Sequence, residues 1–327
     1  MKPLAVSLGD PAGVGPELIF EAWLKREAER LPPFAVTGGL TVMRAAAPGL
    51  AVQVESIDEA RDVYPHALPV LPGGDCDYRP RSPDRDGAQA ALASLRQATM
   101  LTIDGAAGGV VTAPVAKSRL AEVGFRFPGQ TEFLADACET RVADAVMMLV
   151  GPSLRTVPLT VHIPLAEVPA SVSIELIVHR ARIVALALQK DFGLARPRLA
   201  IAALNPHAGE AGRMGREEIE VVSPAIEQLR GEGIDATGPH PADTLFAPRA
   251  RANYDVAIAM YHDQALIPLK ALDFDQGVNV TLGLPIVRTS PDHGTAFDIA
   301  GKGLADPGAM IAAIRMAGEI VARRARA

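Results

Sequence analysis

Three histidines follow short apolar runs that are typical of β-strands. The runs and the histidines after them are residues 156–161 with His162, 199–204 with His207, and 256–260 with His262. Strand ends can converge in space, and neutral imidazole is the commonest protein ligand for zinc-like ions. Three such ligands leave coordination positions free for a substrate, which indicates a catalytic metal site. The gaps between them are long, so the alternative is three unrelated loop histidines, each hydrogen-bonded locally.

Two groups of polar residues accompany this set. Asp263, beside His262, and Asp243 are candidates for carboxylates that orient a ligating imidazole, although each is also typical of a turn or cap. Lys270, Asn279 and Arg288 fall within one short stretch and combine two cations with an amide donor, which suits an anion such as phosphate. The alternative for this trio is a solvated charged surface.

Two glycine-containing segments are candidate ligand loops. Residues 9–17 form a glycine turn that leads into a helix with Pro16 near its first position. This turn has neither the dinucleotide fingerprint nor the P-loop lysine, so neither binding mode is supported, and a compact turn is the alternative. The second segment, His293-Gly294-Thr295-Ala296, precedes two further glycines and could wrap backbone donors around a cofactor.

The elements that must position these residues alternate between strands and helices. Near-continuous apolar strands, beginning with residues 4–8, predict an α/β fold with a mostly parallel sheet covered by helices. Ser173 and Ser223 are predicted helix N-caps, a final helix is expected after Pro307, and residues 71–86 are expected to form a long loop.

Composition narrows the function classes. The chain has 327 residues, 49% of them hydrophobic, and 32 Lys plus Arg against 38 Asp plus Glu give a net charge of −6. The length favours two domains, and the mild acidity argues against nucleic-acid binding. Two cysteines and the absence of a signal-peptide or membrane-spanning run predict a cytoplasmic protein that does not enter a membrane.

Taken together, these segments resemble the PdxA family, the 4-hydroxythreonine-4-phosphate dehydrogenases of pyridoxal phosphate biosynthesis. The resemblance covers essentially the whole chain. It rests on residues 9–17, 112–117, 128–132, 205–210, 238–246, 261–264 and 277–303. The stretch 293–303 also resembles the cofactor loop of isopropylmalate dehydrogenases.

The resemblance implies two α/β/α domains of the isocitrate and isopropylmalate dehydrogenase type, with a cleft between them. We expect one domain from residues 1–126 with 271–327 and a middle domain from 127–270. The resemblance further implies a homodimer with its active site near the subunit interface, and NAD or NADP held without a classical fingerprint. It also implies one divalent ion (Zn, Mg or Co) on His162, His207 and His262, with at least one ligand from the partner subunit.

The same resemblance places Gln130, Thr131, Lys270, Asn279 and Arg288 at a phosphorylated substrate and residues 293–296 at the cofactor. The implied reaction is oxidation of 4-phosphohydroxy-L-threonine at C3, followed by decarboxylation to 3-amino-2-oxopropyl phosphate. Lys270 and Asp263 are the candidate proton acceptors.

One position departs from the family pattern. The family usually has Gly-His-Thr-Glu where this chain has Gly129-Gln130-Thr131-Glu132, and an amide cannot titrate near neutrality. A dehydrogenase of another four-carbon acid phosphate, such as erythronate or threonate 4-phosphate, is therefore one alternative. A phosphate acyltransferase-like enzyme and a non-catalytic module that binds a phosphorylated metabolite are two others, from different classes.

Overall fold

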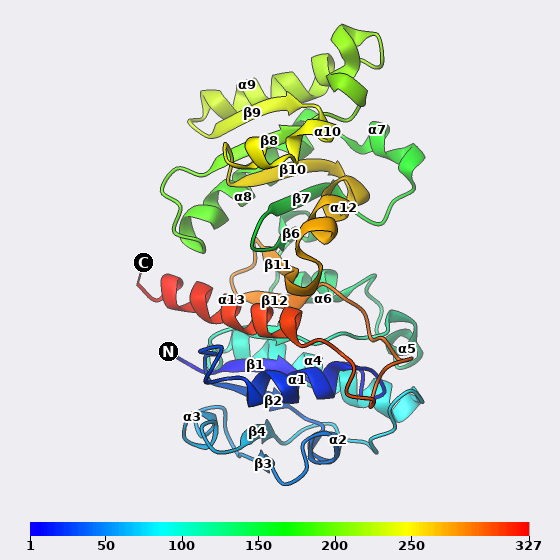
Figure 1. Cartoon of the computed structure of the whole chain (residues 1–327), viewed down its shortest axis with the longest axis vertical. Coiled ribbons are helices and arrows are strands. Elements are labelled where there is room, and N and C mark those ends of the chain that lie inside the picture. The colour runs from blue at the N-terminus through cyan, green and yellow to red at the C-terminus, as the bar shows by residue number, and fades with distance from the viewer. Residues whose placement is uncertain (327) are drawn as a thin grey trace. The chain divides into compact units, whose positions relative to one another are not determined.

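Most strands are short aliphatic runs buried on both faces, as expected for a parallel sheet covered by helices. Every residue is buried in β1 (Leu4–Ser7), β2 (Phe34–Thr37) and β4 (Leu68–Leu71). The computed structural model describes residues 1–326, in which strands and helices alternate along the chain (Figure 1). The predicted α/β fold class is confirmed.

The described chain divides into two compact units. Unit 1 comprises residues 1–145 and 284–326, and unit 2 comprises residues 146–283. Both boundaries lie later in the chain than the predicted ones. Residues 127–145 stay with unit 1 because Leu134 and Ala145 belong to the same apolar cluster as Ala5 and Val110. Residues 271–283 stay with unit 2 because β11 (Val278–Leu282) pairs with β6 (Val146–Val150).

Unit 1 has a parallel sheet in the order β3-β4-β2-β1-β5-β12. Helix α4 packs on β1, and α13 packs on β12; Figure 1 shows α13 lying across the sheet on the side turned toward the viewer. The other elements of this unit are α1 (Gly15–Leu24), α2 (Leu40–Ala46), β3 (Ala51–Gln53), α3 (Ala60–Val63), α4 (Arg85–Ile103), β5 (Val110–Thr112), α5 (Lys117–Glu122), α6 (Gln130–Ala137), η1 (Val142–Asp144), β12 (Arg288–Pro291) and α13 (Gly308–Arg324).

Unit 2 has a mixed sheet in the order β11-β6-β7-β10-β8-β9. The pairs β11–β6 and β6–β7 are antiparallel. The pairs β7–β10, β10–β8 and β8–β9 are parallel. The other elements are β7 (Arg155–Thr160), η2 (Leu165–Glu167), α7 (Val168–Ser171), α8 (Ile174–Lys190), β8 (Arg198–Ala202), η3 (Pro206–Gly212), η4 (Glu218–Val222), α9 (Ser223–Gly231), β9 (Asp235–His240), α10 (Ala242–Leu245), α11 (Pro248–Arg251), β10 (Val256–Tyr261), α12 (His262–Asp273) and η5 (Phe274–Gln276).

The helix starts test the predicted caps. Ser173 caps α8 as predicted, because its hydroxyl accepts a hydrogen bond from the Leu176 backbone N–H at 3.1 Å. The predicted cap at Ser223 is wrong, since the chain is already helical through the π-helical turn η4 before α9 begins. The final helix α13 starts directly after Pro307 as predicted. No helix within residues 1–326 combines the length and the apolar character needed to cross a bilayer.

Candidate active site

The three candidate histidines follow three neighbouring strands of unit 2. Strands β7, β10 and β8 are adjacent and parallel, so their carboxyl ends meet at one edge of the sheet. His162 follows β7, His262 follows β10 as the first residue of α12, and His207 follows β8. The sequence order of these strands differs from their spatial order, and only the fold reveals that the three ends are neighbours.

Two side chains hold these strand ends together. The Thr160 hydroxyl donates to the Met260 carbonyl at 2.8 Å, which joins the ends of β7 and β10. The buried Gln264 accepts from the Met260 backbone N–H at 2.7 Å and donates to the Ala203 carbonyl at 2.9 Å, which joins β10 to the end of β8. The backbone that carries the histidines is therefore fixed by buried hydrogen bonds.

His162 and His262 form a pair. Their ring centroids lie 5.9 Å apart, and both rings line a cavity of about 280 Å³ together with Tyr261, Leu165 and other residues. His262 Nδ1 and Asp263 Oδ1 are 2.7 Å apart, which leaves Nε2 of His262 as the ring atom for a ligand. This contact is the one expected of a carboxylate that orients a ligating imidazole. Asp243, the other predicted carboxylate, lies exposed in the first turn of α10.

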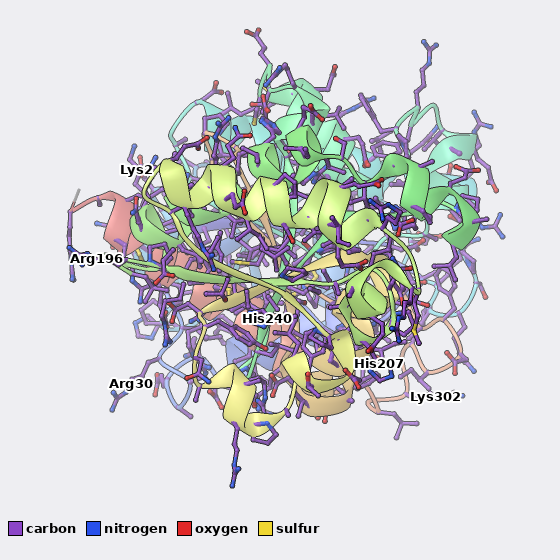
Figure 2. The ribbon with its side chains drawn as sticks, turned by 90° about the horizontal axis from the view of Figure 1, so that it is seen from above. Lys2, Arg30, Arg196, His207, His240 and Lys302 are labelled. Carbon is purple, nitrogen blue, oxygen red and sulfur yellow. The ribbon has the colours of Figure 1, made fainter. Side chains whose placement is uncertain are left out.

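His207 lies in an unusual left-handed turn and does not complete the pair. The backbone φ angles of residues 207–211 are 52°, 53°, 75°, 43° and 55°, and only Gly209 among these residues favours such values. Each non-glycine residue in this conformation costs about 1–2 kcal/mol. Among residues 1–326, no group of three or more His, Cys, Asp or Glu side chains is placed to hold a metal ion. Figure 2 labels His207 on the ribbon of unit 2.

The side chains of His162, His262 and Asp263 are of the types that hold a divalent ion. The two imidazole centroids lie 5.9 Å apart, the side chain of His262 is 39% exposed, and the Asp263 carboxylate contacts its ring. Imidazole and carboxylate are the ligand and supporting group that zinc-like ions prefer. The pair offers two imidazoles of the kind that bind such an ion, and a site with three histidines would need one from outside the pair.

Lys270 and Asn279 are the predicted substrate residues of unit 2, and both follow His262 in the chain. Lys270 lies in the last turn of α12, and Asn279 lies in β11. The Asn279 Oδ1 atom is buried without a hydrogen-bond partner in the described part of the chain. Buried polar atoms without a hydrogen-bond partner are rare in folded proteins.

Unit 1 contains a buried guanidinium that we call the arginine site: Arg288 with Thr112 and Gln130. Arg288 is 4% exposed, and its Nη2 donates to Thr112 Oγ1 at 2.8 Å and to Gln130 Oε1 at 3.0 Å. Burial lowers the pKa of Arg288 to about 10, partly opposed by the charge of Glu132. The arginine stays cationic at neutral pH, so the site is suited to an anion.

The start of α6 supports the same anion preference. Gln130 is the first residue of α6 and its Nε2 also reaches the Ala113 carbonyl at 3.5 Å, so the side chain joins the helix start to β5. Thr131 follows it in the first turn. A helix start presents free backbone N–H groups, which favour a negative charge. The structure thus joins two predicted substrate residues, Gln130 and Arg288, and adds Thr112 from the motif at 112–117.

The predicted cofactor segment packs on the glycine turn. The Val14 backbone N–H donates to the Thr295 carbonyl at 2.9 Å, and a Cβ at Gly13 would lie 2.8 Å from that oxygen, so only glycine permits this approach. The Gly301 backbone N–H donates to Glu17 Oε2 at 3.1 Å. Nε2 of His293 is buried without a hydrogen-bond partner among residues 1–326. These contacts hold residues 293–296 in a defined position.

Asp10 is a buried carboxylate in the same glycine turn. It is 4% exposed, its Oδ1 accepts from the Ala12 backbone N–H at 3.0 Å, and burial raises its pKa. The turn therefore carries a charge that the fold does not fully compensate.

Sequence reasoning missed Glu218, which is buried directly behind the His207 turn. The only signal was an acidic pair, Glu217-Glu218, ahead of an apolar run, and such pairs are normally read as a solvated helix start.

Comparisons with known proteins show the family to which the chain belongs. The family model described as "Pyridoxal phosphate biosynthetic protein PdxA" matches residues 30–317. The chain belongs to the PdxA family. A protein of Erythrobacter litoralis named 4-hydroxythreonine-4-phosphate dehydrogenase is 63% identical, over 100% of this chain and 98% of its own length. A relative of the same name from Zymomonas mobilis is 52% identical over 97% of this chain and 95% of its own length.

Solved structures give the same result for the PdxA fold. The crystal structure of 4-hydroxythreonine-4-phosphate dehydrogenase from Klebsiella pneumoniae matches with a TM-score of 0.84 at 36% identity, covering 98% of each chain. A terephthalate 1,2-cis-dihydrodiol dehydrogenase from Burkholderia xenovorans matches with a TM-score of 0.66 at 29% identity, covering 97% of this chain and 98% of its own. The chain is thus similar to dehydrogenases along its whole length.

Proposed function

We propose that this PdxA-family chain oxidises 4-phosphohydroxy-L-threonine at C3 with NAD and that the product then loses carbon dioxide, which yields 3-amino-2-oxopropyl phosphate. The observation that carries the proposal is the arginine site: a buried, cationic Arg288 held by Thr112 and Gln130. A guanidinium fixed in this way is suited to a phosphate group. The names of the full-length relatives point to the same substrate.

The residues divide into three tasks. Arg288, with Gln130, Thr131 and Asn279, binds the phosphorylated substrate, and residues 293–296 bind NAD or NADP. His162, His207 and His262 hold one divalent ion, either Zn, Mg or Co. When bound, the ion supplies Lewis-acid chemistry and NAD supplies the hydride acceptor.

The hydroxyl proton must leave to a side chain of the enzyme. Lys270 and Asp263 are the candidates, and both belong to α12. Asp263 Oδ1 already contacts Nδ1 of His262, so that carboxylate is committed to orienting the ring. We therefore assign the proton transfer to Nζ of Lys270 and the orientation of His262 to Asp263.

The need for a third metal ligand is the reason to propose a homodimer. His162 and His262 form a pair that His207 of the same chain does not complete in the described residues. We propose that His207 of the partner subunit completes the site. The active site then lies near the subunit interface of a cytoplasmic homodimer.

The direct test is NADH absorbance with the purified protein, NAD and 4-phosphohydroxy-L-threonine, with and without a chelator. We expect NADH formation that the chelator abolishes and that added Zn²⁺ or Co²⁺ restores. Turnover that survives exhaustive chelation would contradict the metal site, and failure of all NADH formation would contradict the dehydrogenase.

A second candidate is favoured by Gln130. The amide accepts from Arg288 and cannot gain a proton near neutrality, so a substrate that needs a titrating group at this position would be disfavoured. Erythronate or threonate 4-phosphate is then the alternative substrate. Comparing kcat/KM for erythronate 4-phosphate and 4-phosphohydroxy-L-threonine separates the two.

The acyltransferase alternative shares only the architecture. A branched-chain phosphotransacylase from Enterococcus faecalis matches with a TM-score of 0.50 at 14% identity, which is a likeness of fold alone. Acyl transfer needs neither NAD nor the histidines. NADH formation that depends on metal would exclude it.

A further inference from the structure

Glu218 is a buried carboxylate that the proposed reaction does not use. It is 3% exposed and begins the π-helical turn η4. Its Oε1 accepts hydrogen bonds from the backbone N–H groups of Leu204 and Asn205, at 2.9 and 2.8 Å. Its Oε2 accepts from Nδ2 of Asn205 at 3.0 Å. All three bonds come from the segment that leads into the His207 turn.

The same carboxylate also contacts the turn itself. A Cβ built on Gly209 would lie 2.5 Å from Oε2 of Glu218, so this oxygen packs directly on the backbone in the middle of the left-handed run. Glu218 therefore touches the chain on both sides of His207. A turn with four non-glycine residues in the left-handed region persists only where its surroundings hold it there.

The hydrogen bonds at Asn205 require a carboxylate at position 218. Nδ2 of Asn205 donates to Oε2 of Glu217 at 2.6 Å as well as to Oε2 of Glu218. A carboxylate only accepts hydrogen bonds, whereas an amide at position 218 would also present an NH₂ group. That group would face the NH₂ of Asn205, and rotating the Asn205 amide would turn its oxygen toward Glu217. Glutamine at position 218 therefore costs the network at least one of these hydrogen bonds.

We propose that Glu218 is a positioning residue for metal binding, which holds the left-handed turn so that His207 presents its imidazole to the divalent ion. Glu218 is not itself a ligand. The inference rests on the metal site of the proposed function.

The test is a Co²⁺ titration of the metal-free full-length protein, followed by the visible absorption of the bound ion. In E218Q, we expect the Co²⁺ dissociation constant to rise about 10- to 100-fold, the range typical for loss of a group behind a metal ligand. The spectrum of bound Co²⁺ should also change, because one imidazole is displaced. E220Q is the matched control, since Glu220 lies in the same turn but is exposed and pairs with Arg216. It should bind Co²⁺ as the wild type does.

G209A adds a Cβ that would push against Oε2 of Glu218, so it disturbs the contact between this oxygen and the turn but keeps the carboxylate. This variant replaces E218Q in the titration if E218Q does not fold. It should weaken Co²⁺ binding in the same direction. Amide hydrogen exchange of peptides covering residues 204–213, measured without metal, should rise in E218Q and G209A and stay unchanged in E220Q.

A purely structural role would lower the melting temperature of E218Q but leave the Co²⁺ affinity and spectrum of the folded protein at wild-type values. That result would overturn the inference and leave the proposed function intact. A wild-type protein that binds no Co²⁺ would overturn the metal site and this inference together.

Discussion

The arginine site and the histidine pair differ in how completely one chain builds them. Arg288 is 4% exposed, and both of its hydrogen-bond partners described above, Thr112 and Gln130, lie in its own unit. The side chain of His262 is 39% exposed, and its ring centroid lies 5.9 Å from that of His162. Arg288 makes both of these hydrogen bonds within its own unit, whereas the proposed metal site needs a ligand beyond the histidine pair.

The contrast has a physical basis. A buried guanidinium must have its hydrogen bonds satisfied during folding, because an isolated charge in the interior is expensive. Imidazoles are neutral when they bind a metal. They therefore carry no buried charge that must be compensated before the ion and the remaining ligand bind. We therefore expect changes at the arginine site to affect stability as well as activity. Changes at the histidine pair should affect activity alone.

The largest expected effect follows from His262→Ala. Turnover should fall about 10²- to 10⁴-fold, because Lewis-acid stabilisation is worth several kcal/mol. The melting temperature should barely move, since the ring is half-exposed. The measurement is NADH formation together with the metal content of the purified variant. A metal-free variant with near-normal turnover would contradict the proposed metal-binding role of the histidine pair.

Arg288→Ala should have the next largest effect on activity and the largest on stability. We expect kcat/KM to fall about 10²- to 10³-fold, as for truncation of a buried charged partner. The free energy of unfolding should drop by about 1–3 kcal/mol because Thr112 and Gln130 lose their donor. Arg288→Lys is the control: it keeps the charge and loses the planar fork. Unchanged unfolding by urea in Arg288→Ala would contradict a preassembled arginine site.

Gln130→Leu should have a smaller effect than Arg288→Ala on both stability and substrate binding. The variant removes the acceptor of an Arg288 N–H, and an unsatisfied buried donor costs about 1–3 kcal/mol. KM for the phosphorylated substrate should therefore rise about tenfold or more, while KM for NAD stays unchanged. Equal changes in both KM values would show that Gln130 supports the whole unit and not the anion alone.

Asp10→Asn should give the smallest effect, and it should be one of stability. Burial raises the pKa of Asp10 above its ordinary value of 3.8, so the folded state favours the neutral form and the ionised form destabilises it near neutral pH. Asparagine keeps the acceptor for Ala12 without the charge. The variant should melt higher than the wild type at neutral pH, and the difference should vanish as the pH falls below 3.8. A variant that melts lower at neutral pH would contradict the burial penalty.

The sequence predicted local features well. The buried strands, the Ser173 cap and the helix after Pro307 follow from apolar runs and short-range capping rules. Histidines at strand ends were recognisable for the same reason. These signals depend on residues that lie within one turn or one strand of each other.

Long-range features were beyond such rules. Arg288 meets Thr112 and Gln130 across 176 and 158 residues of chain, so their contact depends on the strand order of the sheet. The left-handed turn at His207 runs against the preference of Ala and Glu, and it persists through contacts that only the fold supplies. The Ser223 cap failed because a π-helical turn upstream extends the helix.

The most direct test of the shared metal site mixes two inactive variants. His207→Ala and His262→Ala chains, each with a different affinity tag, are co-expressed and the heterodimer is purified through both tags. If His162 and His262 of one subunit share an ion with His207 of the partner subunit, one of the two symmetric sites is intact, and the heterodimer regains about half of the wild-type turnover. A heterodimer as inactive as its parents would show that all three ligands come from a single chain and would contradict the shared site.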